Sequence, residues 1–177
     1  AVRIDINEIA SLELRSNLEN TLIRSNINDL NKDLETNLET TILISDMSKP
    51  TYYVENKKFK TFIDKDNNGY FAFGSFFNDD IDRIENQDGF YIFLDLKELN
   101  IDSLFFSNQT ENNSYLKSIK LKVDELNFFD NIYFNQNFEI NLLPNETVAS
   151  FSGKNLNGSI RIDSTDFIRV DVFDTKF

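Results

Sequence analysis

Residues 8–40 read EIASLELRSNLENTLIRSNINDLNKDLETNLET, and the interpretation of the whole chain depends on this stretch. On a helix, with about 100° per residue, most of its aliphatic side chains fall on one stripe. From Ile23 onward the steps along the stripe alternate between four and three residues, as in a helix that faces a core. The stretch therefore predicts one long amphipathic helix. Its stripe consists of Ile9, Leu12, Ile23, Ile27, Leu30, Leu34 and Leu38.

The first half of this predicted helix is apolar on a second side. Leu14, Leu18 and Leu22 fall nearly opposite the main stripe, whereas polar residues such as Asp29 and Lys32 occupy that side further on. A helix with two apolar sides must be covered on both, either by its own domain or by a second chain. A helix of this length would extend about 50 Å, more than a compact domain of this size needs, which favours the second chain.

The N-terminal residues alternate between apolar and polar side chains. Val2, Ile4 and Ile6 are separated by Arg3 and Asp5, which predicts a short, half-buried strand. This strand could pair within its own sheet, or it could add to the sheet edge of a neighbouring subunit.

The chain from residue 49 to 177 is typical of a β-rich domain. Short segments rich in aromatic and β-branched residues recur between breaks that contain Asn, Asp, Gly or Pro. We therefore predict an α+β protein in which residues 1–48 form a strand and a long helix as an assembly element. Residues 49–177 then form an antiparallel β-sandwich or jelly-roll-like domain. The expected strands cover residues 52–55, 59–63, 70–77, 90–96, 119–123, 128–134, 138–143, 148–151, 159–162 and 167–173.

Composition excludes several kinds of chemistry. The 177 residues include no Cys and no His, which removes thiolate nucleophiles, the Ser-His-Asp triad and Cys- or His-ligated metal sites. The net charge of −12 disfavours binding to nucleic acid and to anionic lipid. No segment reaches the roughly 20 apolar residues of a membrane-spanning helix. We expect a protein that is not an enzyme and that has no resident cofactor.

One short segment resembles the beginning of an EF-hand calcium loop. Residues 64–69 read DKDNNG, which places Asp64, Asp66 and Asn68 at the first three ligand positions and Gly69 at the turn. The carbonyl oxygen of Tyr70 would be the next ligand. The resemblance ends there, because Ser75 stands where a bidentate Glu is required. The alternative is a hairpin turn between two strands, with positive φ angles supplied by Asn and Gly.

These observations favour a non-enzymatic structural subunit. It would form homo-oligomers through its N-terminal strand and helix, in an extracellular or cell-surface filament or fibre, or in a virion-type particle. In build it is similar to fibre and pilin subunits that combine a helix with a β-domain. The predicted assembly residues are Val2, Ile4, Ile6, Leu14, Leu18 and Leu22. The alternative is a calcium-assisted adhesin or carbohydrate-binding β-sandwich, whose partner would be a surface glycan.

Overall fold

The computed structural model describes residues 2–6, 10–46, 48–78, 87–100, 115–128, 131–154, 156–165 and 167–174. Within these residues almost all regular structure is β-strand. The only helices described are two short 3₁₀ helices, η1 (Asn28–Leu30) and η2 (Gly74–Asn78). The α+β prediction is therefore wrong, and the chain is nearly all β. In the part of the chain that is described, no helix is long and apolar enough to cross a membrane.

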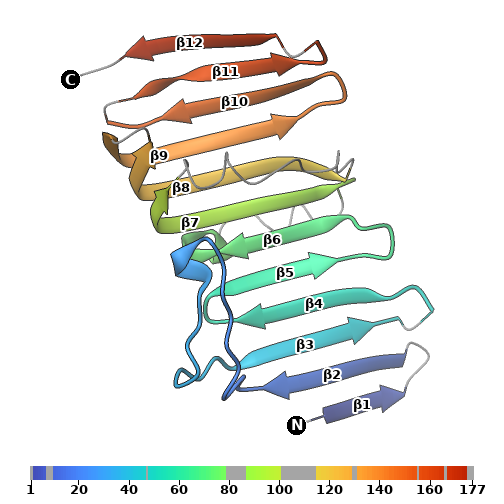
Figure 1. Cartoon of the computed structure of the whole chain (residues 1–177). Coiled ribbons are helices and arrows are strands. Elements are labelled where there is room, and N and C mark those ends of the chain that lie inside the picture. The colour runs from blue at the N-terminus through green and yellow to red at the C-terminus, as the bar shows by residue number, and fades with distance from the viewer. Residues whose placement is uncertain are drawn as a thin grey trace. The chain divides into compact units, whose positions relative to one another are not determined.

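The chain divides into two compact units. The first contains Ala1–Ser25 and Leu30–Tyr91, and the second contains Asn26–Asp29 and Ile92–Phe177. In the first unit each strand pairs antiparallel with the next, and so do the strands of the second unit from β8 (Leu116–Phe128) to β12 (Ile168–Asp174), whereas β7 (Phe90–Asn100) and β8 run in the same direction (Figure 1). A jelly roll requires crossovers between non-consecutive strands. The described strands instead lie in the sheet in sequence order, so the predicted sandwich or jelly-roll-like domain is also wrong.

The first unit contains six strands among its described residues. The strand predicted at residues 2–7 is present as β1, and it pairs with β2 of the same chain. The strands are β1 (Val2–Ile6), β2 (Ala10–Ser16), β3 (Thr40–Ser45), β4 (Thr51–Asn56), β5 (Phe59–Ile63) and β6 (Gly69–Phe73).

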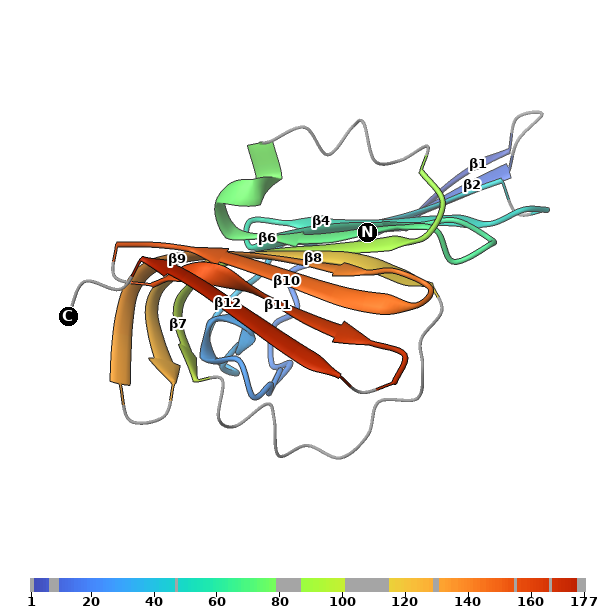
Figure 2. The same ribbon diagram turned by 90° about the horizontal axis from the view of Figure 1, so that it is seen from above.

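The second unit has longer strands. Figure 2 shows that β8 and β9 curve along their length. The two pair in one register, from Ser118↔Asn141 to Phe128↔Asn131, and Asn135 adopts a φ of 51° within β9. The strands are most of β7 (Phe90–Asn100), then β8 (Leu116–Phe128), β9 (Asn131–Leu142), β10 (Glu146–Ser152), β11 (Asn157–Asp163) and β12 (Ile168–Asp174).

The predicted helix fails first at β2. Leu12 and Leu14 alternate with Glu13 and Arg15, so the segment also has the two-residue period of a strand. It pairs on both sides, with β1 and with β3, and Leu14 lies opposite Ile42. Hydrogen bonds to the two neighbouring strands pair its backbone groups, and the strand places both leucines on one face of the sheet. These contacts decide the structure of the segment, although the same residues also fit a helical period. Ile9 lies outside the described residues.

Beyond β2, polar side chains accept hydrogen bonds from backbone amides that would donate to backbone carbonyls in a helix. The Leu18 amide donates to Ser16 Oγ at 3.1 Å, and the Ser25 amide donates to Asn31 Oδ1 at 2.6 Å. Such side-chain acceptors compete with helical carbonyls, which is why Ser and Asn favour turns. Leu18 and Asn20 have φ angles of 48° and 58°, outside the right-handed helical region. The segment is consequently a structured loop.

A buried lysine closes this loop. Lys32 forms an isolated antiparallel bridge with Ile23, with both backbone hydrogen bonds at 3.0 Å. Its side chain is 4% exposed, and Nζ donates to the carbonyl oxygens of Thr21 at 2.8 Å and Asp33 at 3.0 Å. Lys32 thus ties together two parts of the loop that a helix would hold far apart.

Each unit has its own buried apolar residues. In the first unit they include Leu38, Tyr70, Ala72 and Phe73. In the second unit they come from β7, β8 and β10, and comprise Phe93, Leu96, Leu99, Leu121, Val123, Leu126 and Phe151. None of the buried residues described in the second unit belongs to β12, so the packing of that unit leaves its last strand open.

Candidate functional site at the open edge of the second unit

One face of the second unit's sheet is apolar from β8 to β12. Cross-strand partners point to the same face of a sheet, so the strand register identifies its rows of neighbouring side chains. One row is Ile119, Ile140, Ala149, Ile160 and Val170. The rows on either side are Leu121, Phe138, Phe151, Gly158 and Val172, and then Leu142, Thr147, Ile162 and Ile168.

This apolar face becomes more exposed toward β12. Leu121 on β8 and Phe151 on β10 are each 8% exposed. Ile162 on β11 is 38% exposed, and Val170 and Ile168 on β12 are 55% and 60% exposed. Contiguous exposed apolar patches are uncommon on monomeric proteins and mark interaction surfaces. The open part of the face is therefore the strongest candidate for a binding surface among the described residues.

The opposite face of the same strands is polar. Lys120 Nζ lies 3.7 Å from Glu139 Oε1, and Arg169 Nε lies 3.0 Å from Asp171 Oδ2. This pair is flanked by two exposed aromatic residues, Phe167 just before β12 at 66% and Phe173 within it at 74%. The exposed residues of this strand thus present apolar side chains on one face, and a charged pair between two phenylalanines on the other.

Among the described strands, none pairs with the second edge of β12. Among the described strands β12 is last in the sheet order and pairs only with β11. A strand at a sheet edge presents a row of unpaired N–H and C=O groups to any further strand. Natural edge strands often carry Lys, Pro or other charged residues as protection; Ile168–Asp174 contains no Lys or Pro, and its charged residues Arg169 and Asp171 pair with one another. This edge is therefore suited to pairing with another strand.

A carboxylate fixes the turn that leads into β12. Asp163 Oδ1 accepts hydrogen bonds from Thr165 Oγ1 at 2.6 Å, from the Thr165 amide at 2.8 Å and from the Phe167 amide at 3.1 Å. The Thr165 hydroxyl, followed by the two amides, lowers the pKa of Asp163 below its usual 3.8. The turn is well organised when Asp163 is ionised, so the direction of the edge strand is set locally.

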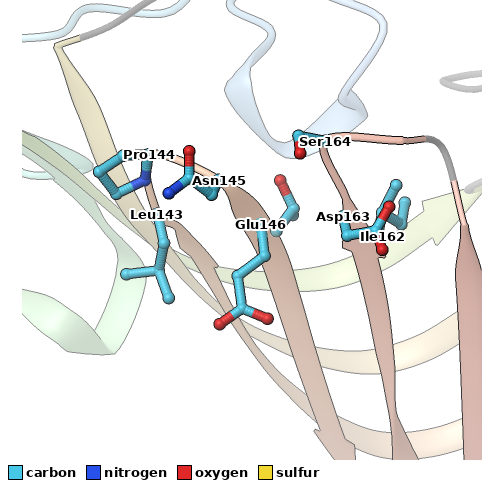
Figure 3. A pocket seen from close by; sticks show the side chains of 8 residues that line it. Leu143, Pro144, Asn145, Glu146, Ile162, Asp163 and Ser164 are labelled. Atoms are coloured by element: carbon cyan, nitrogen blue, oxygen red, sulfur yellow. The ribbon is translucent and has the colours of Figure 1, made fainter.

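A shallow pocket lies beside this turn (Figure 3). Its volume is about 400 Å³, and residues from the β9–β10 and β11–β12 connections line it. The Ser164 amide donates to the Asn145 carbonyl at 3.0 Å, which joins the two connections. The charged lining residues are Glu146 and Asp163, cross-strand partners whose carboxylates lie apart in Figure 3.

The segment that resembles a calcium loop forms the turn between β5 and β6. Asp64 Oδ1 accepts the amides of Asp66 and Asn68, each at 2.8 Å, and Asp64 Oδ2 accepts the Asn68 side-chain amide at 3.0 Å. Asn68 Oδ1 accepts the Gly89 amide at 2.7 Å. The Tyr70 carbonyl accepts the Thr61 hydroxyl at 2.6 Å. These oxygens hold the hairpin together and, through Gly89, join it to the segment before β7.

The geometry of this turn matches the alternative that the sequence left open. Asn67 has a φ of 63° and Gly69 a φ of 148°, the positive values expected of Asn and Gly in a hairpin turn. In the described part of the chain no group of three or more acidic side chains could hold a metal ion. Calcium binding at Asp64, Asp66, Asn68 and Tyr70 stays a prediction, and a calcium ion would have to replace the hydrogen bonds around Asp64.

The residues predicted to drive assembly are not gathered on one helix face. Val2, Ile4 and Ile6 belong to β1, and their side chains lie outside the described part of the structure. Leu14 is half-buried in β2, whereas Leu18 and Leu22 belong to the loop that follows, where Leu22 is 50% exposed. Six of the exposed large hydrophobic residues among those described instead lie between Ile162 and Phe173. The alternation at residues 167–173 was recognised as a strand, but periodicity alone does not show which face is covered.

The chain matches no protein-family model, no curated protein and no solved structure.

Proposed function

We propose that this protein is a non-enzymatic building block that assembles with further chains through the open edge and apolar face of its second unit. The observation that carries the proposal is β12, which is last in the strand order and whose apolar side chains Ile168, Val170 and Val172 are all more than half exposed. Burying such side chains against another sheet or strand stabilises a complex by about 25 cal/mol per Å² of apolar area.

The composition supports a role that does not depend on catalysis. The chain contains no Cys and no His. The exposed edge offers apolar, aromatic and paired charged groups, which are the usual components of protein interfaces. Assembly through a sheet replaces the helix-mediated assembly expected from residues 8–40. A filament, fibre or virion-type particle, in an extracellular setting, stays a prediction.

Light scattering over a range of concentrations tests this proposal. We expect a mass above the 20.7 kDa of one chain at high protein concentration. Val170→Lys should shift the distribution toward the monomer, because a lysine on an edge strand opposes pairing. Leu143→Lys is the matched control, since Leu143 is 49% exposed but lies outside the strands. A single species of 20.7 kDa at every concentration would refute the proposal.

A second candidate function is binding of an apolar ligand, such as a hydrocarbon chain, on the same face. The continuous rows from Ile119 to Val170 favour it, because most of their side chains are only half-buried. A fluorescent fatty acid should then bind at protein concentrations where the chain is monomeric. Ile162→Lys should weaken that binding, whereas Leu34→Lys, a change at an exposed leucine of the first unit, should not. Binding that follows only the oligomeric fraction would count against this candidate.

A further inference from the structure

Residues 167–173 read FIRVDVF, and their side chains are arranged symmetrically about Val170. Ile168 and Val172 are the apolar neighbours two positions away, and Arg169 and Asp171 are the charged neighbours on either side. Phe167 and Phe173 end the segment. The five large hydrophobic residues of this segment are between 51% and 74% exposed. The open edge of β12 is therefore nearly palindromic in chemical type, with opposite charges at equivalent positions.

A strand with this pattern is complementary to a second copy of itself. If two β12 edges pair antiparallel about Val170, Arg169 of each copy lies opposite Asp171 of the other, and Ile168 lies opposite Val172. Phe167 then lies opposite Phe173. Cross-strand pairs of opposite charges, of aliphatic residues and of aromatic residues each stabilise an antiparallel sheet.

Within one copy, the charged side chains of β12 do not lie opposite side chains of opposite charge on β11. Across the β11–β12 pair Arg169 lies directly opposite Arg161, and like charges at such positions are destabilising. Asp171 lies opposite Ser159 in the same pair. The carboxylate that balances Arg169 comes from Asp171 of the same strand, at 3.0 Å. A second β12 would bring an additional Asp to each Arg on the side that is now open.

We infer that the open edge of β12 binds the β12 edge of a second copy of this chain, antiparallel and with a two-fold axis at Val170. This inference rests on the proposed assembly function and identifies the partner and the register. The charges of Arg169 and Asp171 favour this antiparallel register over the alternatives. Parallel pairing in register would place Arg169 opposite Arg169, and a two-fold axis at Arg169 or at Asp171 would place like charges at the centre. A two-fold axis makes this interface isologous, so it closes as a dimer.

Cysteine cross-linking tests the register directly, because the natural chain has no cysteine. Directly opposed residues of an antiparallel pair have Cβ atoms about 4.5–5.5 Å apart and alternate between closer and wider pairs. Val170→Cys alone, or an equimolar mixture of Arg169→Cys and Asp171→Cys, should therefore form covalent dimers rapidly on mild oxidation. Leu143→Cys is the exposed control and should form few. If neither arrangement exceeds this control, the inference is overturned.

Charge reversal provides a second test that needs no covalent bond. Arg169→Asp places carboxylates at both charged positions, and Asp171→Arg places guanidinium groups at both. Each variant alone should dimerise roughly tenfold more weakly than the natural chain, because two like-charged pairs form at the interface. An equimolar mixture of the two variants should recover dimers, since every Arg then faces an Asp. Failure of the mixture to recover dimers would contradict pairing about Val170.

These experiments separate the inference from the proposal on which it rests. If the natural chain is oligomeric by light scattering but insensitive to changes at positions 169–171, assembly holds and the β12 register is wrong. If the natural chain is monomeric at every concentration, both the assembly proposal and the β12 inference are refuted. Circular dichroism of each variant should match that of the natural chain, because all the altered side chains belong to an exposed edge strand.

Discussion

Gly69 closes the β5–β6 hairpin at a position where any side chain would collide with the backbone. Its φ is 148°, and a Cβ atom at this position would lie 2.0 Å from the Phe62 carbonyl oxygen. Phe62 belongs to the paired strand β5 and cannot move away without breaking the ladder. Gly69→Ala should therefore lower the free energy of unfolding by about 2 kcal/mol or more, measured by urea denaturation.

Gly153 is an informative comparison for this substitution. A Cβ there would lie 2.0 Å from Gln136 Nε2, an atom at the end of a flexible but buried side chain. The destabilisation by Gly153→Ala should be relieved when Gln136 is also shortened to Ala, whereas no single side-chain change should rescue Gly69→Ala. Equal rescue at both positions would contradict the backbone collision at Gly69.

Asp64 makes the first hairpin sensitive to acid. Partial burial raises its pKa, but the hydrogen bonds from the Asn68 side chain, from the Asn68 and Asp66 amides, and the charge of Lys65 together lower it below 3.8. A carboxyl group with a lowered folded-state pKa stabilises the fold above its unfolded-state pKa. That stability is lost as the pH falls through the lowered value.

The expected outcome is a stability profile that depends on Asp64 only in acid. Asp64→Asn should be less stable than the natural chain at neutral pH, and the difference should shrink as the pH falls below 3.8. Urea denaturation across this pH range measures it, with the exposed loop variant Glu35→Gln as control. A constant difference down to the lowest pH would show that the ionised carboxylate is not what stabilises the turn. The natural chain also tests the predicted calcium site. An unchanged melting temperature in millimolar calcium would exclude calcium binding at the Asp64 turn.

At the scale of single elements, local alternation gave correct predictions and longer periodicity did not. β1 and the last strand were recognised because apolar and polar residues alternate strictly over five or more positions. The long helix was wrong because its stripe was assembled from leucines and isoleucines separated by Asn, Ser and Asp. Those polar side chains bind nearby amides, as Ser16 and Asn31 do, and this competition is invisible to a count of apolar spacing.

The sequence does not show which strands are neighbours or which side chains are exposed, because the same residue pattern fits more than one arrangement. An alternating strand has one apolar face whether a second layer covers it or not, so Val170 and the buried Val123 follow the same pattern. The sandwich was expected because short strands recur at even spacing between breaks of Asn, Asp, Gly or Pro, a pattern that a single sheet shares. Only the structure shows that β12 has one neighbour among the described strands and that its apolar side chains are exposed.

The loop that replaces the helix depends on one element-scale contact, the buried side chain of Lys32. Lys32→Met keeps most of the aliphatic length but removes the donors to the carbonyls of Thr21 and Asp33. We expect a loss of about 1.5–3 kcal/mol in the free energy of unfolding, the usual contribution of hydrogen bonds made by a charged group. Lys57→Met, at an exposed turn position, is the control and should change stability little. Equal effects of the two changes would show that the Lys32 contacts do not hold the loop.

At the scale of the whole molecule, net charge opposes the association that β12 favours. Each copy carries −12 at pH 7, so two copies repel one another at long range. The Debye length falls from about 30 Å at 0.01 M salt to about 8 Å at 0.15 M, which screens this repulsion strongly. The attraction at the interface comes mostly from apolar burial, which salt does not weaken, and from a few exposed Arg–Asp pairs, whose contribution is small.

The dimer should therefore bind more tightly at the higher of these salt concentrations. Sedimentation velocity at the two ionic strengths measures the change in the dimer dissociation constant. The double variant Arg169→Asp with Asp171→Arg keeps the net charge and the opposite-charge pairing, so its salt dependence should match that of the natural chain. If added salt instead dissociates the dimer, local ion pairs rather than the apolar rows of β12 hold the two copies together, because only the pairs are weakened by screening.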